Sequence, residues 1–215
     1  FLQARFGDVV AHKTYAFISD GGIQEEISQG AGRLAGFLGL SNLIMFYDAN
    51  RVQLSTMVNE VTDEDIAAKY RAWNWNVIEI NGNNADEIAS AITAAQAETK
   101  RPTLIIGNTV MGLGAVAAAG ENFENQCSTH GQPLSKSGAD YAMTVRNLGG
   151  DPENPWAIPA DVQKLYDDRN AQLREIVAKR HKAEAEWAAA NPEKAQTLKD
   201  YIAGKLPDID YSAIV

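Results

Sequence analysis

The chain has 215 residues, of which 45% are hydrophobic and 22% are charged, values that exclude a disordered, collagen-like or disulfide-framework protein. Nineteen basic residues against 28 acidic ones leave a formal charge of −9 with no basic cluster, so we predict no nucleic-acid partner. No apolar run approaches the roughly 20 residues that cross a bilayer, and Cys127 is the single cysteine, so we expect no membrane partner and a cytoplasmic location.

Along the chain, predicted strands alternate with predicted helices. Residues 1–6 lack an initiator Met and have the pattern of the end of an amphipathic helix, so we expect a piece of a longer polypeptide. Short apolar runs rich in β-branched or aromatic residues predict buried strands at residues 13–18, 42–47, 76–80 and 103–108. Helices are predicted from Ile23, after Thr62 as an N-cap, and after Asn84 in a capping box with Glu87. This alternation predicts an α/β fold, a mostly parallel open sheet with helices on both faces.

The first of these helices and the last third of the chain give further expectations. Apolar residues recur from Ile23 through Leu38 at steps of three and four, which predicts one helix with one apolar face. Residues 115–126 have no clear period and predict a long loop. Three prolines within residues 149–159 end the compact domain, and charged helices follow up to Ala190 and from Pro192. We therefore assign residues 1–150 to an α/β domain and residues 151–215 to a helical linker.

Polar clusters follow two of the predicted strands, at Asp20-Gly21-Gly22 and at Asp48-Ala49-Asn50. In parallel sheets, ligands bind beyond the carboxyl ends of the strands. A glycine turn that enters a helix offers N–H groups to a diphosphate, or it serves only as a turn that needs positive φ. Asp20 and Asn50 offer the oxygen ligands that magnesium prefers. Structural roles remain open: Asp20 as a helix N-cap, Asn50 as a turn residue and Glu25 as a solvated acid of the first turn.

These clusters and their flanks resemble a known family. Asp20-Gly21 precedes Asn50 by thirty residues with a helix between them, which resembles the thiamine-diphosphate motif. The segments that resemble transketolase in particular are residues 34–36 with Leu40, then 45–48, 109–114 and 129–134, and the resemblance spans essentially all of the chain. It implies a truncated thiamine-diphosphate-binding fold and an enzyme that transfers a two-carbon ketol unit from a ketose phosphate to an aldose phosphate. The implied cofactors are thiamine diphosphate and Mg²⁺ or Ca²⁺.

The resemblance also implies roles for particular residues. Implied metal ligands are Asp20, Asn50 and the carbonyl of Val52, and the implied cofactor-binding residues are Asp20, Gly21, Asn50, Leu54 and His130. His130 also matches a histidine near the reacting sugar. Glu25 matches a buried acid that links paired active sites across a homodimer. The implied partners are thus sugar phosphates and a second copy of the parent protein, with the active site at the subunit interface.

The sequence departs from the family in two places. Ser19 stands where the family motif usually begins with Gly, and the loop between Gly114 and Ser128 is longer than in relatives. The sequence also lacks the pyrimidine-binding domain that supplies an activating glutamate, so we expect the isolated chain to be inactive. Other interpretations are a non-catalytic interaction module, a deoxyxylulose-phosphate synthase or a two-oxoacid dehydrogenase component. The sequence after Thr109 favours transketolase.

Overall fold

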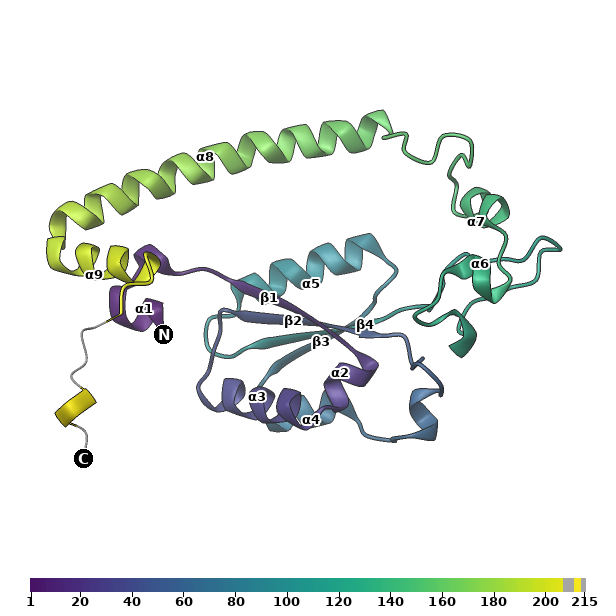
Figure 1. The fold of residues 1–215 in the computed structure, drawn as a ribbon, viewed down its shortest axis with the longest axis horizontal. Helices are drawn as coiled ribbons and strands as arrows, with labels where there is room; N and C mark the ends of the chain where they lie inside the picture. The colour runs from purple at the N-terminus through teal and green to yellow at the C-terminus, as the bar shows by residue number, and fades with distance from the viewer. Residues whose placement is uncertain (207–210, 214–215) are drawn as a thin grey trace. The chain divides into compact units, whose positions relative to one another are not determined.

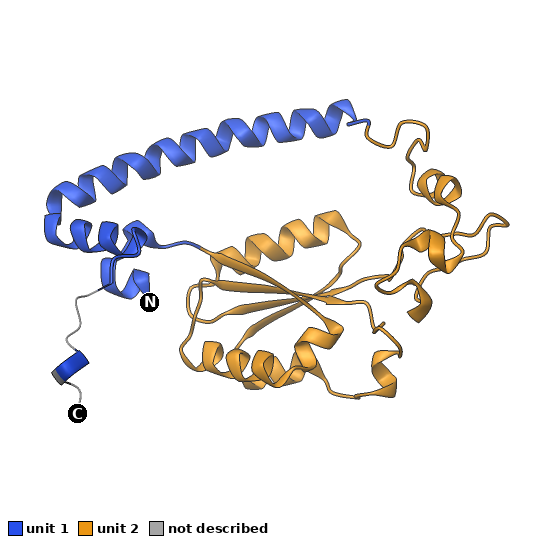
Figure 2. Cartoon of the chain, in the orientation of Figure 1, with its two compact units in different colours: residues 1–12, 157–215 blue, residues 13–156 orange. Residues whose placement is uncertain are grey.

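A computed structural model describes residues 1–206 and 211–213. The chain forms two compact units, residues 13–156 and residues 1–12 with 157–215 (Figure 2). Each unit is a group of residues that pack together, which is a different criterion from an evolutionary domain. The domain boundary predicted between residues 150 and 151 therefore stays a prediction. Within the described residues, no helix is both long enough and apolar enough to span a membrane.

The larger unit is built on a four-stranded sheet in the order β1-β2-β4-β3, with every neighbouring pair parallel (Figure 1). The strands are β1 (Thr14–Ser19), β2 (Leu43–Ala49), β3 (Asn76–Asn81) and β4 (Thr103–Asn108). The helices are α2 (Asp20–Gln24), α3 (Glu26–Phe37), α4 (Ile66–Ala72) and α5 (Ala85–Ala97). Helices α3 and α4 cover one face and α5 covers the other (Figure 1). The predicted α/β fold with a mostly parallel sheet is therefore confirmed.

Strand β4 lies between two neighbours and contributes to a core on each face of the sheet. Leu104 and Ile106 join the core under α3 and α4, whereas Ile105 packs with Ile44 and the alanines of α5. Successive side chains of a strand point to opposite faces. A strand covered on both faces is therefore apolar without alternation, which explains the continuous run in the sequence.

The helix predicted from Ile23 is interrupted. Glu25 has an extended backbone, at φ −63° and ψ 133°, and separates α2 from α3. The apolar face predicted for this helix is present on α3, but it is not the buried one: Ile27 is 87% exposed and Leu34 57%. The buried positions of α3 are instead Gly32, Ala35 and Gly36.

The reason for this reversal is the size of the side chains opposite α3. Tyr70 and Trp75 are fully buried there, with ring centroids 5.1 Å apart, and Trp75 Nε1 donates to the carbonyl of Gly32 at 2.8 Å. A β-carbon on Gly36 would overlap the carbonyl oxygen of Trp73. Large aromatic rings on one side therefore require small residues on the other.

The start of α4 differs from the prediction. Asp65, and not Thr62, is the N-cap, since its carboxylate accepts from the amide of Ala68 at 2.8 Å. The Thr62 hydroxyl instead accepts from the amide of Glu64 in the preceding loop, which also contains the 3₁₀ turn η2 (Val58–Glu60). Both are local side-chain bonds of the kind that capping residues form, so the sequence pattern fits either position.

Helix α5 starts as predicted, with the Asn84 side chain accepting from the amides of Asp86 and Glu87. The reciprocal half of the predicted capping box is absent. The Glu87 carboxylate accepts from the amide of Asn81 at 2.8 Å and thereby ties the helix start to the end of β3.

Residues 109–156 complete the larger unit with little regular structure. They contain η3 (Cys127–Thr129), α6 (Leu134–Ser137) and α7 (Tyr141–Asn147). No helix or strand lies within residues 115–126, apart from a single bridge between Val116 and Asn122, so the predicted loop is confirmed.

The smaller unit is helical, with α1 (Leu2–Phe6), α8 (Ala160–Ala190), α9 (Pro192–Ile202) and the short turns η1 (Asp8–Val10) and η4 (Tyr211–Ala213). Phe6 is buried in it, with its ring edge-on to Trp187 at 6.4 Å and to Tyr201 at 5.9 Å. The predicted helices up to Ala190 and from Pro192 are both present.

Candidate functional site

The first part of the site is the turn from β1 into α2. Ser19 is the N-cap of α2, with its hydroxyl accepting from the amide of Gly22 at 3.4 Å. Its φ is −99°, which any residue adopts. The serine that replaces the family glycine therefore introduces no backbone strain and adds a capping bond. Asp20 is the first helical residue, so it is not the helix N-cap, which was the structural role left open for it from the sequence.

Asp20 lies beneath the turn that follows β2. Its side chain is 2% exposed. Oδ1 accepts from the Tyr47 hydroxyl at 2.6 Å, and Oδ2 accepts from the amides of Asn50 and Arg51 at 3.1 and 2.9 Å. Burial raises the pKa of the Asp20 carboxyl, while these three hydrogen bonds act in the opposite direction. Burial, together with the bond to Asp20, also raises the pKa of Tyr47.

The side chain of Asn50 is held at both ends. Its Nδ2 donates to Asp48 Oδ2 at 3.4 Å, and its Oδ1 accepts from the amide of Val52 at 3.0 Å. The bond from Val52 closes a local turn, so Asn50 has the role of a turn residue that was left open for it from the sequence. Asp48 also accepts from the hydroxyl of Thr109, which follows β4. The side-chain amide of Asn50 is thus held by Asp48 at the end of β2, and Asp48 is in turn held by Thr109 at the end of β4.

His130 comes from the long loop of the larger unit. It follows η3, where its amide donates to the Cys127 carbonyl at 3.1 Å and the Thr129 hydroxyl donates to the Gln126 carbonyl at 2.7 Å. The Nδ1 atom of His130 is buried and has no hydrogen-bond partner among the described residues. A buried polar atom without a partner is costly in a folded protein unless a ligand or water satisfies it.

All of the residues predicted for the site line one cavity of about 520 Å³ at the carboxyl ends of β1 and β2. They are Asp20, Gly21, Glu25, Asn50, Val52, Leu54 and His130. Leu54 is 75% exposed. Glu25 is also exposed in this single chain, so the burial that the resemblance implies would need a covering subunit.

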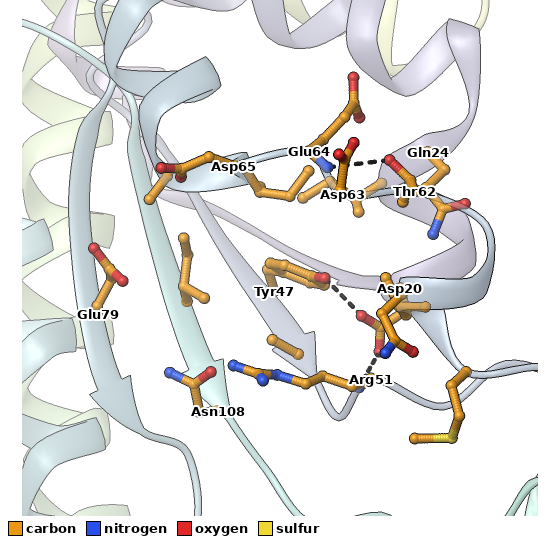
Figure 3. Close-up of a pocket in the computed structure, with 18 residues that line it drawn as sticks. Asp20, Gln24, Tyr47, Arg51, Thr62, Asp63, Glu64, Asp65, Glu79 and Asn108 are labelled. Atoms are coloured by element: carbon orange, nitrogen blue, oxygen red, sulfur yellow. Dashed lines mark hydrogen bonds between the residues drawn. The ribbon is translucent and has the colours of Figure 1, made fainter.

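A second cavity, of about 530 Å³, shares Asp20 and Gln24 with the first. Figure 3 shows this second cavity, with Tyr47 reaching Asp20 and with the Arg51 side chain directed away from Asp20 towards Asn108. Tyr47 lines only the second cavity. Asp20 therefore lies in the wall between the two.

Sequence reasoning did not identify the supporting residues Tyr47, Asp48 and Thr109. One signal was present: Tyr47 ends the apolar run of the strand predicted at residues 42–47, and a buried tyrosine hydroxyl usually has a partner. That the partner is Asp20 depends on the pairing of β1 with β2, where Ser19 lies opposite Asp48.

A parallel α/β sheet with a polar cavity at the carboxyl ends of its strands defines the class of α/β cofactor-binding domains. The sequence profile of the family described as "Transketolase, thiamine diphosphate binding domain" matches residues 2–207. The chain therefore belongs to the transketolase family, and it corresponds to the thiamine-diphosphate-binding domain of that family.

Individual relatives agree with this assignment. Transketolase 1 of Vibrio cholerae is 38% identical over 211 residues, which is 96% of this chain and 30% of the relative. The dihydroxyacetone synthase of Pichia angusta is 37% identical over 206 residues, 93% of this chain and 27% of the relative. The chain thus spans about 30% of the length of the curated relatives that it matches.

Solved structures share the fold. The transketolase of Leishmania mexicana superposes with a TM-score of 0.85 at 25% identity, covering 96% of this chain and 31% of that one. A Pichia stipitis transketolase solved with sedoheptulose 7-phosphate gives a TM-score of 0.81 at 29% identity, covering 95% of this chain and 29% of that one.

Proposed function

We propose that this chain is the part of a transketolase that holds the diphosphate of thiamine diphosphate through a divalent metal ion, within an enzyme that transfers a two-carbon ketol unit between sugar phosphates. One observation supports this most strongly. The residues that the family resemblance predicts, from three separate segments of the sequence, line a single cavity. The family match favours transketolase over the other thiamine-diphosphate enzymes considered from the sequence.

The proposed metal ligands have free oxygen lone pairs. A carboxylate oxygen accepts about two hydrogen bonds. Asp20 Oδ2 already accepts two, whereas Oδ1 accepts one, from Tyr47. Asn50 Oδ1 also accepts only one, and the carbonyl of Val52 accepts none among the described residues. One carboxylate, one amide and one carbonyl oxygen suit a hard ion such as Mg²⁺ that takes its remaining ligands from phosphate and water.

This donor set differs from a cluster of ionisable ligands. The described residues contain no group of three His, Cys, Asp or Glu side chains placed to hold a metal. The proposed site has one charged ligand, so a diphosphate would supply the further negative charge that holds the ion. We therefore expect metal and cofactor to bind together and each to weaken without the other.

Two further features fit a diphosphate. A β-carbon on Gly21 would meet nothing within 4 Å, so this turn leaves open space in the cavity where a ligand can approach the backbone. The buried Nδ1 of His130 lacks a partner among the described residues, and His130 lines the same cavity. A ligand oxygen would give that atom the hydrogen bond that the chain does not supply.

When bound, thiamine diphosphate supplies the carbanion chemistry by which a ketol unit is transferred. The residues of this chain bind and orient it: Asp20, Asn50 and Val52 hold the metal, Gly21 admits the diphosphate and Leu54 packs beside the cofactor. His130 donates or accepts a hydrogen bond at the diphosphate and the reacting sugar. Chemistry at the pyrimidine ring requires groups outside this chain, so the isolated chain is proposed to bind weakly and to be inactive.

The proposed partners are sugar phosphates and a second copy of the parent protein. The Pichia stipitis relative was solved with a sugar phosphate, which supports the first. The exposed apolar side chains of α3, Ile27, Leu34 and Phe37, support the second. They begin two residues after Glu25, which lines the cavity, and a subunit that covered them would bury apolar area beside the site. A cytoplasmic location is proposed from the single cysteine, Cys127.

The test is a calorimetric titration of thiamine diphosphate with and without Mg²⁺, on residues 1–215 and on the natural polypeptide that contains them. We expect binding that requires the metal. Asp20→Ala removes the one charged ligand and should abolish the metal dependence. Gly21→Ala should weaken binding by about tenfold, because it places a methyl group in the cavity.

Gly30→Ala is the matched control. Gly30 lies in α3, and a β-carbon there also meets nothing within 4 Å, but Gly30 does not line the cavity. This variant should bind as the unmodified protein does. Metal-dependent binding that survives Asp20→Ala would contradict the proposed site. Absence of binding to either polypeptide would favour the alternative function, an interaction module that needs no cofactor.

A further inference from the structure

Tyr47 stands beside the proposed metal site without being part of it. Its side chain is 6% exposed, and it lines the second cavity and not the one that contains the proposed ligands. Its hydroxyl donates to Asp20 Oδ1 at 2.6 Å, a short bond of the charge-assisted kind (Figure 3). The ring belongs to the core under α3 and α4, together with Ala35 and Tyr70. Tyr47 therefore joins the rigid core directly to Asp20.

The bond from Tyr47 decides what the Asp20 carboxylate can offer to an ion. The amides of Asn50 and Arg51 occupy both lone pairs of Oδ2, and Tyr47 occupies one of the two on Oδ1. A single lone pair remains on the whole carboxylate. Asp20 can therefore bind a metal through one oxygen only, and from one direction.

This restriction has different consequences for the two ions that the site was predicted to take. Mg²⁺ requires near-ideal octahedral geometry, whereas Ca²⁺ accepts six to eight oxygens in flexible arrangements with carboxylates bound through one or both oxygens. A carboxylate with one fixed lone pair suits the first ion and gives the second no advantage.

We propose that Tyr47 is a positioning residue that fixes the Asp20 carboxylate for single-oxygen coordination and thereby sets a preference for Mg²⁺ over Ca²⁺. The proposal rests on the proposed function, since it assumes that Asp20 is a metal ligand. Tyr47 touches neither metal nor cofactor and acts through Asp20 alone.

The test measures the dissociation constants of Mg²⁺ and of Ca²⁺ by calorimetry, with thiamine diphosphate saturating, on the natural polypeptide and on its Tyr47→Phe variant. Phenylalanine keeps the ring and removes only the hydroxyl. The loss of a residue that orients a metal ligand lowers metal affinity by about 10- to 100-fold. We expect about tenfold for Mg²⁺, because the two backbone amides still hold Oδ2, and at most about threefold for Ca²⁺ because of its tolerance.

Tyr70→Phe is the matched control. Tyr70 is another fully buried tyrosine of the same core, but its hydroxyl has no partner within the described part of the chain and it lines neither cavity. Removal of the Tyr70 hydroxyl should change neither the Mg²⁺ nor the Ca²⁺ dissociation constant. Should Tyr47→Phe fail to fold, replacement of Tyr47 by fluorotyrosine keeps the hydroxyl as a stronger donor, and the Mg²⁺ preference should then be preserved or increased.

The outcomes separate the two proposals. If the metal affinity of the unmodified protein does not depend on Asp20, the proposed function fails and this inference fails with it. If Asp20 is required but Tyr47→Phe leaves the ratio of the Mg²⁺ and Ca²⁺ affinities unchanged, Tyr47 is only a structural residue and this inference alone is overturned. If Tyr47→Phe lowers the affinities for both ions by the same factor, this inference is likewise overturned. It is also overturned if the protein with fluorotyrosine at position 47 loses its preference for Mg²⁺.

Discussion

Two buried tyrosines of one core provide a sharp test of how hydrogen bonds contribute to the stability of this chain. Tyr70 is 0% exposed, and its hydroxyl has no hydrogen-bond partner among the described residues. Burial raises its pKa to about 12. Tyr47 is 6% exposed, and its hydroxyl donates to Asp20. The same substitution, tyrosine to phenylalanine, should therefore have opposite effects at the two positions.

The expected magnitudes follow from the partners. A buried polar group without a partner costs about 1–3 kcal/mol, so Tyr70→Phe should raise the free energy of unfolding by about 1 kcal/mol after the loss of some packing. A hydrogen bond to a charged group contributes about 1.5–3 kcal/mol, so Tyr47→Phe should lower the free energy of unfolding by about 2 kcal/mol. The two variants should differ by about 3 kcal/mol, or roughly 6–12 °C in Tm for a chain of this size.

Urea unfolding followed by tryptophan fluorescence measures this difference. Trp73 and Trp75 lie within 4.9 and 5.1 Å of the Tyr70 ring, between centroids, and report on the larger unit. The slope of free energy against urea should be the same in both variants, since neither changes the surface exposed on unfolding. A loss of stability in Tyr70→Phe as large as in Tyr47→Phe would refute the reasoning, because it would mean that ring packing and not the hydroxyl determines both values.

Three further predictions concern the same unit. Gly36→Ala places a β-carbon on the Trp73 carbonyl and should cost about 3 kcal/mol in urea unfolding, whereas Gly30→Ala, in open space, should stabilise by roughly 0.5–1 kcal/mol; a similar loss in both would contradict the close packing of α3. In metal-free protein, the urea midpoint of Asp20→Asn relative to that of the unmodified protein should rise as the pH goes from below the ordinary aspartate range to neutral, because burial raises the pKa of Asp20 and folding of the unmodified protein is penalised where that carboxyl is charged. A difference between the two midpoints that is independent of pH would exclude the charge as its cause. Asn84→Ala removes the acceptor of two amides at the start of α5 and should lower the free energy of unfolding by about 1 kcal/mol, with no change expected if those amides are solvated equally well.

The site residues could be predicted from the sequence because their positions follow from local rules. A strand followed directly by Asp20-Gly21, and another followed by Asn50, place polar side chains at one edge of any parallel sheet. Val52 and Leu54 follow within a few residues, so the chain cannot carry them far. Glu25, Leu54 and His130 are exceptions, because only the family resemblance and not the local pattern indicated them, and the place of His130 in the same cavity as Leu54 depends on a long loop.

The supporting contacts could not be predicted in the same way. The bond from Tyr47 to Asp20 joins residues 27 positions apart, and it exists only because β1 and β2 pair in a register that brings their ends together. The residue pattern along one strand does not by itself show which strand pairs with it, and hence which strand ends lie side by side.

The sequence by itself determined the four strands, the cap at Asn84, the two polar strand ends and the family. Each depends on neighbours in the chain, through side-chain alternation, capping chemistry or motif spacing. Only the tertiary structure decided that α3 buries Gly32 and Gly36 and exposes Ile27. Periodicity shows which face of a helix is apolar, but the buried face must also fit what lies opposite, and here Trp75 and Tyr70 leave room for a backbone and little more.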